Sequence, residues 1–381
     1  MTEYQESDLI RLAKRDHNTK RVYLLVNPLQ GKHIPVSPTR SLAMMEQLGR
    51  KVAQAHPEAD LVIGFAETAT AVAAAVAGML GTPCFYLQTS REPAVAKAEV
   101  LSFQEEHSHA TDQFLFTGGL RERIRQARKI VFVDDELSTG KTLINIIAQM
   151  RDTFPEMEEK PLVAASLINR LSGERTAELK ARGVDCVALL QLPLRDYTEA
   201  VRGFGIDPAL PAATEGAFET LPFQGETPDP RFGVEIRDYA RRLDELCDKL
   251  IGEFGPRLSR GRVTLIGTEE YMLPGLLLGR RMEEAGLADS VRFHATTRSP
   301  IGICRDPAYP IHEGYLLPSF YETGRKTYLY NIEACDTAVL WTDAGDLRQA
   351  ETAAGALAGV LARKGCGRVI LIWEKTHVQH L

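Results

Sequence analysis

The chain has 381 residues, of which 44% are hydrophobic and 25% charged, and its formal net charge is −6. These values are ordinary for a water-soluble globular protein with room for two domains. The acidic balance argues against general binding to nucleic acid or to an anionic membrane, and the longest apolar run (69–80) is too short to span a bilayer. The six cysteines show no C-x-x-C spacing and residues 1–15 do not resemble a secretory signal, so we expect a cytoplasmic protein without disulfides or a zinc site.

The first part of the chain alternates between strand and helix patterns. The expected elements are a strand at 21–26, a loop at 27–36, a helix at 41–56, a strand at 60–64, a helix at 70–80 and a strand at 83–87. The 70–80 helix is rich in alanine and can pack closely on a sheet. Strand, loop, helix and strand in this order form a βαβ unit, which implies parallel pairing.

The most informative stretch is 129–142. Four apolar residues predict a buried strand that ends in two adjacent carboxylates, Asp134 and Asp135. A Ser-Thr-Gly-Lys-Thr turn follows and leads into a helix over 143–150. Backbone amides at such a turn bind phosphate, and carboxylates accept hydrogen bonds from the two hydroxyls of a diol. The pattern therefore indicates a site for ribose 5-phosphate.

Two other interpretations of this stretch explain less. Gly-Lys-Thr also ends a nucleotide-binding P-loop, but that motif requires a glycine five residues before Gly140, where the chain has Asp135. A strand that ends in a solvated acidic turn would account for the two aspartates. It would not account for the complete run from strand through turn to helix.

The stretch resembles the phosphoribosyl-pyrophosphate (PRPP) motif of type I phosphoribosyltransferases. The resemblance implies an α/β fold with a Rossmann-like parallel sheet, a hood and a flexible loop. In that family the acidic pair, here Asp134 and Asp135, holds the ribose hydroxyls. The 5-phosphate would be held by Ser138, Thr139, Gly140, Lys141 and Thr142. Purine-salvage members carry Asp where this chain has Ser138, so the base stays unidentified.

The resemblance also assigns roles to earlier loops. The 27–36 loop corresponds to the hood, where Lys32 and His33 are either base contacts or solvated tips. The loop after the 60–64 strand corresponds to the pyrophosphate-binding loop, whose backbone amides face the leaving group. Its candidate residues are Phe65, Ala66, Glu67 and Thr68. Glu67 is unusual there, because its charge would repel pyrophosphate unless a cation intervenes. Arg91 is a candidate clamp, since a guanidinium forks onto phosphate oxygens.

A long polar stretch up to residue 111 falls where type I enzymes close a flexible loop over the reacting atoms. Glu106, His107 and His109 are candidates there for proton transfer or base contacts, although a solvated turn is also consistent with them. No third spaced metal ligand is evident in the sequence. We therefore expect Mg²⁺ to be carried by PRPP oxygens rather than by direct protein ligands.

The remaining elements indicate two domains. Strands at 162–168 and 184–190 complete a first sheet of about five or six parallel strands. Residues 208–232, rich in Pro, Gly, Thr and Glu, predict a linker without regular structure between domains of residues 1–207 and 233–381. An amphipathic helix over 233–254 opens the second domain.

The second domain carries patterns that match the first. Residues 263–270 match 61–67, and residues 338–345 echo 130–135 but lack the phosphate-binding turn. The second domain is therefore either a degenerate copy of the first or an α/β domain with chance similarities.

The run from Thr296 to Ile301 resembles the motif of the TRSP domain. That domain follows a phosphoribosyltransferase domain in a bacterial family associated with tellurite resistance, whose members are predicted to help make a nucleoside-like metabolite. Candidate site residues on the loops of this domain are Glu269, Glu270, Arg298, Ser299, His312 and Glu313, with Asn331 and Asp343 as weaker candidates. The Arg-Ser-Pro turn either binds a phosphate or carboxylate, or fixes a domain interface.

Together these features predict a PRPP- and Mg²⁺-dependent phosphoribosyltransferase of nucleotide metabolism. It would act on PRPP or a ribonucleotide and an unknown base, as a homodimer, with neither nucleic acid nor membrane as partner. The alternative is a non-catalytic protein that binds PRPP or a nucleotide and acts as a sensor or scaffold.

Overall fold

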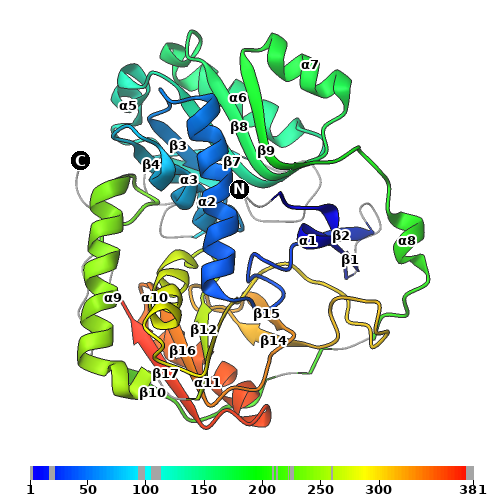
Figure 1. The fold of residues 1–381 in the computed structure, drawn as a ribbon, viewed down its shortest axis with the longest axis vertical. Helices are drawn as coiled ribbons and strands as arrows, with labels where there is room; N and C mark the ends of the chain where they lie inside the picture. Colours follow the sequence, from blue (N-terminus) through cyan, green and yellow to red (C-terminus); the bar gives the residue numbers. More distant parts are fainter. Residues whose placement is uncertain are drawn as a thin grey trace.

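The computed structural model describes residues 3–16, 22–92, 99–103, 113–207, 210–211, 213–221, 223, 227–258 and 261–374. Two lobes lie one above the other in Figure 1, each built around a sheet with helices on its faces. The long helices α2 (Pro38–Ala55) and α9 (Ile236–Leu258) run along both lobes, because each packs against α3 (Thr70–Met79) of the first lobe and α10 (Leu273–Glu284) of the second.

The first lobe contains a six-stranded sheet. In spatial order its strands are β11 (Val234–Glu235), β4 (Phe85–Gln88), β3 (Leu61–Gly64), β7 (Ile130–Leu137), β8 (Leu162–Asn169) and β9 (Val184–Gln191). All neighbouring pairs are parallel except β11 with β4. Every residue of β8 is buried, as expected for a strand covered on both faces. The predicted α/β class and parallel sheet are confirmed, with one short antiparallel strand added from the second half of the chain.

Other elements surround this sheet. They are α1 (Glu6–Leu9), the β1 (Arg11–Lys14) and β2 (Tyr23–Val26) pair, the β5 (Val100–Phe103) and β6 (Gln113–Phe116) pair, α5 (Leu120–Gln126), α6 (Lys141–Thr153), η1 (Pro155–Met157), α7 (Gly173–Ala181) and α8 (Thr198–Arg202).

The second lobe contains a five-stranded sheet in which all neighbouring strands are parallel. Its order is β10 (Glu219–Leu221), β17 (Arg368–Trp373), β16 (Thr337–Thr342), β12 (Arg262–Gly267) and β13 (Ser290–Ala295). The β14 (Gly314–Pro318) and β15 (Lys326–Tyr330) hairpin and α11 (Leu347–Arg363) complete it.

The expected linker 208–232 is not free of regular structure. β10 lies within it and pairs with β17, which buries Leu221. The helix expected from residue 233 begins at Ile236, because Val234 and Glu235 first pair with β4. The chain therefore passes from the second sheet back to the edge of the first before α9 begins.

The predicted hood lies between the two lobes, with β1 and β2 at the right of Figure 1. Val36 and Phe293 of β13 exchange backbone hydrogen bonds of 3.0 and 2.7 Å. Gly31 has φ +75°, and a Cβ there would lie 2.5 Å from the Phe293 ring, so only glycine fits between the lobes. The second lobe thus fixes the position of the hood.

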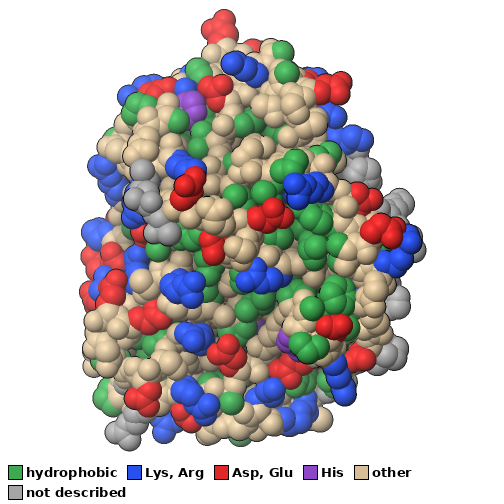
Figure 2. All heavy atoms as spheres, turned by 45° about the vertical axis from the view of Figure 1, so that its right-hand side comes forward, with side chains coloured by type: hydrophobic (Ala, Val, Ile, Leu, Met, Phe, Trp, Pro, Cys, Tyr) green, Lys and Arg blue, Asp and Glu red, His purple; other side chains and the backbone are tan. Residues whose placement is uncertain are grey.

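Acidic and basic side chains are interspersed on the face that Figure 2 shows, without a broad region of one sign. Within the described ranges, no helix is long and apolar enough to cross a membrane.

Candidate active site

The acidic pair lies at the carboxyl end of β7, in the middle of the sheet. β7 continues to Leu137, beyond the predicted end at residue 133, so both aspartates are part of the strand. Both side chains are half-buried, and the Asp135 amide donates a 2.8 Å hydrogen bond to Asp134 Oδ1. Open parallel sheets bind ligands at this edge, so the pair is placed where a ribose could reach it.

The predicted phosphate turn connects β7 to α6. Gly140 adopts the left-handed conformation (φ 71°, ψ −2°) at the N-cap of α6, and a Cβ there would lie 2.9 Å from Leu171 Cδ2. Thr139, Lys141 and Thr142 are exposed and Ser138 is half-buried. The glycine N-cap has no side chain, and the Lys141 amide instead donates to Thr139 Oγ1 over a long 3.5 Å, so the positive end of α6 is suited to an anion.

A buried arginine beside the acidic pair was not predicted from the sequence. Arg170, which follows β8, is fully buried and donates to Glu136 Oε1 at 2.9 Å. Its guanidinium lies 5.7 Å from the Tyr23 ring of β2 and 5.1 Å from the Tyr197 ring. Arg170 therefore balances the charge of Glu136 next to the acidic pair, and its contact with Tyr23 connects β2 to the sheet.

The loop between β3 and α3 is tightly built. Phe65 stacks on Phe132 at 6.0 Å, and its amide donates to Val133 O at 3.0 Å. The Ala66 amide donates to Thr89 Oγ1 at 2.8 Å. These two amides are used inside the protein and do not face a leaving group, contrary to our expectation. Within the described ranges, the amides of Glu67 and Thr68 make no hydrogen bond, so they are the loop donors open to a ligand.

Lys32 and His33 are buried rather than solvated tips. Lys32 Nζ lies 2.5 Å from Thr68 Oγ1 and 3.3 Å from Glu67 Oε1, so the hood reaches the expected pyrophosphate loop. His33 lies 6.1 Å from the Tyr330 ring, and burial, with Lys32 nearby, holds its pKa well below the ordinary value. His33 is therefore neutral at pH 7, and the hood contributes one positive charge to the loop.

Glu67 is paired with cations from both lobes. Its carboxylate lies 3.3 Å from Lys32 Nζ and 3.5 Å from Arg298 Nε of the second lobe. Burial alone would raise the pKa of Glu67, but Lys32 and Arg298 outweigh it and lower the pKa below its ordinary value. The carboxylate is therefore ionised, and its charge is balanced within the protein.

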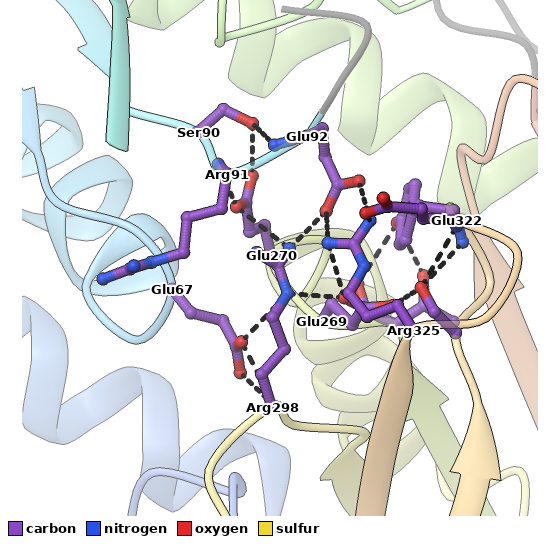
Figure 3. Close-up of polar contacts among 12 residues, drawn as sticks. Glu67, Ser90, Arg91, Glu92, Glu269, Glu270, Arg298, Glu322 and Arg325 are labelled. Carbon is purple, nitrogen blue, oxygen red and sulfur yellow. Dashed lines mark hydrogen bonds and ion pairs between the residues drawn. The ribbon is translucent and has the colours of Figure 1, made fainter. Parts of the chain in front are cut away.

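Arg298 is the centre of a charged cluster between the lobes, shown in Figure 3. Its Nε lies 2.6 Å from Glu269 Oε2, and its Nη2 contacts Glu92 and lies 3.3 Å from Glu270 Oε1. Arg325 also pairs with Glu92, at 2.9 Å, and with Glu269, at 3.5 Å. The Arg-Ser-Pro turn thus lies at the domain interface, one of the two roles that the sequence left open.

The cluster holds more buried acid than its arginines balance. Burial and the neighbouring Glu270 carboxylate raise the pKa of Glu92 to about 8, even though Arg298 and Arg325 both pair with it. Glu92 is therefore largely protonated at neutral pH. Neither Glu92 nor Arg325 was a candidate from the sequence, since isolated charged residues there resemble solvated loop positions.

Arg91 lies at the rim of this cluster. Its amide donates to Glu270 Oε1 at 2.7 Å, while its guanidinium points away from Glu92, Glu269 and Glu270 in Figure 3, and its charge helps to lower the pKa of Glu67. Ser299 contributes backbone groups, because its carbonyl accepts from Tyr330 Oη at 2.9 Å.

The other candidates of the second lobe have separate partners. His312 Nδ1 lies 3.2 Å from Cys304 O, and Glu313 pairs with Lys364 at 2.9 Å. The Asn331 side chain accepts from the His312 amide at 2.9 Å. Asp343 pairs with the buried Arg231. These contacts do not bring the four residues to Arg298.

Glu106, His107 and His109 lie outside the described residues. The segment that contains them connects β5 to β6, so their predicted roles stay predictions.

Models of two known protein families match most of the chain. Residues 9–191 match the model described as phosphoribosyl transferase (PRTase_2), and residues 229–359 match the TRSP domain that lies C-terminal to it. The chain belongs to this family. It is a phosphoribosyltransferase with a TRSP domain, as the sequence motifs predicted.

Solved structures with similar folds include adenine and orotate phosphoribosyltransferases. The adenine enzyme from Thermoanaerobacter pseudethanolicus is 18% identical, with a TM-score of 0.33, over 48% of this chain and 96% of its own. The adenine enzyme from Giardia lamblia is 15% identical, with a TM-score of 0.36, over 50% and 98%. The orotate enzyme from Aeropyrum pernix is 24% identical, with a TM-score of 0.26, over 40% and 72%. No curated protein matches the sequence.

Proposed function

We propose that this phosphoribosyltransferase uses PRPP and carries its chemistry in the first lobe, within a domain of residues 1–207. Residues 208–232, which include the edge strand β10 of the second sheet, then connect it to a TRSP domain of residues 233–381. The observation that carries the proposal is the half-buried acidic pair at the end of β7 beside an open helix N-terminus at Gly140. An acceptor of diol hydroxyls and a binder of dianionic phosphate are the two functions that ribose 5-phosphate requires.

We assign a role to each part of this site. Asp134 and Asp135 accept hydrogen bonds from the ribose 2′ and 3′ hydroxyls. The turn from Ser138 to Thr142 binds the 5-phosphate, and the amides of Glu67 and Thr68 with Arg91 receive the pyrophosphate. The C1–O bond to pyrophosphate breaks, a C1–N bond to the base forms on the opposite face, and the base releases its proton. The residues of the β5–β6 connection are proposed to cover the reacting atoms.

Mg²⁺ fits this arrangement as part of the substrate. Across the described residues, no group of three or more His, Cys, Asp or Glu side chains could hold a metal ion. Hard cations prefer oxygen ligands and Mg²⁺ retains much of its own shell, so the oxygens of pyrophosphate and ribose, beside Asp134 and Asp135, suit it. When bound, the ion would neutralise charge on the leaving group.

Titration calorimetry with PRPP and Mg²⁺ tests the proposal. The Asp134→Asn/Asp135→Asn variant should bind PRPP at least roughly tenfold more weakly than the wild type, because it loses charged hydrogen-bond partners. Asp152→Asn is a matched control, since Asp152 is an exposed carboxylate at the far end of α6. Unchanged binding by the double variant would refute the assigned ribose site.

The acceptor base and the direction of the reaction then require a screen. Purified protein incubated with PRPP and individual bases should release pyrophosphate with one class of base, as expected for synthesis of a nucleoside-like metabolite. Binding of PRPP without turnover on any base would instead indicate a sensor. Light scattering tests the homodimer that the family resemblance implies.

A further inference from the structure

The second lobe repeats the connectivity of the first. The strand order β4-β3-β7-β8-β9 has its counterpart in β13-β12-β16-β17-β10, and every neighbouring pair in both runs is parallel. The connections also correspond in type: α3 to α10, the β5–β6 pair to the β14–β15 hairpin, and α6 to α11. The edge strand β10 differs from its counterpart β9, because β10 comes before the other strands of its sheet in the sequence and β9 comes after them. Chance similarity of short motifs does not explain a shared order of strands, hairpin and helices.

The correspondence extends to single hydrogen bonds in the loops after β3 and β12. The Thr89 amide donates to Gly64 O at 2.9 Å, and the Thr296 amide donates to Gly267 O at 3.0 Å. Two residues after each glycine, an amide donates to the hydroxyl of that threonine: Ala66 to Thr89 at 2.8 Å, and Glu269 to Thr296 at 3.0 Å. These loops are therefore equivalent positions of two related domains.

The equivalent loops face each other and exchange contacts. Three residues after each glycine stands a glutamate, Glu67 in the first lobe and Glu270 in the second. Glu67 accepts from the Arg298 amide at 3.3 Å, and Glu270 accepts from the Arg91 amide at 2.7 Å. The residue before each arginine also bonds the same carboxylate through its side chain: Thr297 bonds Glu67, and Ser90 bonds Glu270. The contacts between the two loops are thus reciprocal, as expected for related domains that pack against each other through equivalent surfaces.

The second lobe has replaced the ligand-binding groups of the first with its own side chains. By register, Asp343 stands where the first lobe has Asp135, and it is buried against Arg231 and Tyr321 Oη, the latter at 2.6 Å. Asp346 caps α11 and accepts from the Arg348 amide at 2.9 Å, where α6 has an open Gly140. A carboxylate at the helix N-terminus takes the place that a phosphate would need.

We infer that the TRSP domain is a degenerate transferase copy that no longer binds PRPP, and that it holds the pyrophosphate loop of the active copy through Arg298. Arg298 is a positioning residue in this view, because it touches Glu67 and not the reacting atoms. An uncompensated Glu67 would repel pyrophosphate, whereas Glu67 held by Lys32 and Arg298 leaves the adjacent amides directed to the leaving group. The inference rests on the proposed function, since it assumes that this loop receives pyrophosphate.

Comparing PRPP with ribose 5-phosphate separates this role from general folding. The two ligands share the ribose and the 5-phosphate, and only PRPP has the pyrophosphate. In calorimetry with Mg²⁺, Arg298→Gln should weaken PRPP binding by roughly tenfold to a hundredfold and change ribose 5-phosphate binding less than about twofold. The double variant Glu67→Gln/Arg298→Gln removes both charges and should recover most of the PRPP affinity.

Two further variants control for folding. Arg231→Gln removes a buried arginine that pairs with Asp229 at 2.8 Å and with Asp343, and it should leave the ratio of the two affinities unchanged. If Arg298→Gln does not fold, Thr297→Val replaces it. That change removes the Thr297 hydroxyl, which bonds Glu67 and also accepts from the Ser299 amide at 3.1 Å, and it should weaken PRPP binding selectively by several-fold.

The possible outcomes distinguish failure of the positioning role of Arg298 from failure of the proposed function. Selective loss of PRPP with recovery in the double variant supports the positioning role. Equal loss of both ligands, or no loss, overturns this inference while the ribose site stands. Absence of binding of either ligand to the wild type overturns the proposed function and this inference with it.

Discussion

Gly140→Ala tests the phosphate turn directly. Gly140 has φ +71° at the N-cap of α6, and an added Cβ would lie 2.9 Å from Leu171 Cδ2 and 3.3 Å from Arg175 Cγ. The methyl group therefore imposes both backbone strain and a close contact on the turn that is proposed to bind the 5-phosphate. Gly183→Ala is its matched control, because Gly183 has φ +76° with open space around the added Cβ and lies in the turn after α7.

The expected magnitudes differ between stability and binding. An L-residue in the left-handed conformation costs about 1–2 kcal/mol, so both variants should lose stability by about this amount. Each kcal/mol lowers the melting temperature of a domain of this size by about 2–4 °C. Relief of the backbone strain in Gly140→Ala is expected to shift the turn and its amides relative to the phosphate, while the contact with Leu171 Cδ2 adds to the strain. We expect it to bind ribose 5-phosphate at least about tenfold more weakly, whereas Gly183→Ala should bind as the wild type does.

Differential scanning fluorimetry gives the melting temperatures, and calorimetry with ribose 5-phosphate gives the affinities. The reasoning is refuted if Gly140→Ala loses stability as its control does and yet binds ribose 5-phosphate with wild-type affinity. The phosphate site would then have to be sought elsewhere in the first lobe.

Two further predictions concern the interface between the lobes and the second lobe itself. The pKa of Glu92 is raised from 4.5 to about 8, so its contribution to stability is complete below the lower value and is lost as the pH rises through about 8. Glu92→Gln should therefore reduce the loss of stability with rising pH over this range, by at most about 1.4 kcal/mol per pH unit. Denaturant titrations at several pH values measure this slope. A slope equal to that of the wild type would contradict the protonation of Glu92. Asp346→Ala should cost about 1 kcal/mol of stability through loss of the α11 cap, and it should leave PRPP affinity unchanged in calorimetry. Weaker PRPP binding in that variant would show that the second copy still takes part in binding.

The sequence predicted the parts of the fold that local patterns determine. Continuous apolar runs predicted β7 and β8, because a strand buried on both faces needs apolar residues throughout. Short strands were missed or misplaced: β10 lies in the expected linker, and β11 lies at the expected start of a helix. Strands of two or three residues carry too little periodicity to be recognised, and their pairing partners are far away in the sequence.

The candidate site likewise contains residues that the sequence predicted and residues that only the structure revealed. The acidic pair and the phosphate turn are adjacent in the chain, so their combination was visible in the sequence. Arg170 and Glu92 were not candidates, because a buried charge is recognisable only when its partner is known. Arg170 has partners on β2 and β7, and Glu92 has partners in the second lobe.

Glu67 was a candidate from the sequence, but its partners are known only from the structure. From the sequence it was an anomaly, since a carboxylate in a pyrophosphate loop requires a cation. The structure supplies Lys32 from the hood and Arg298 from a position 231 residues away. Because the second of these cations belongs to the TRSP motif, the charge balance of the proposed pyrophosphate loop depends on the second lobe. A first lobe without the second would expose Glu67 with one of its two cations missing, so the two lobes are expected to act as one catalytic unit.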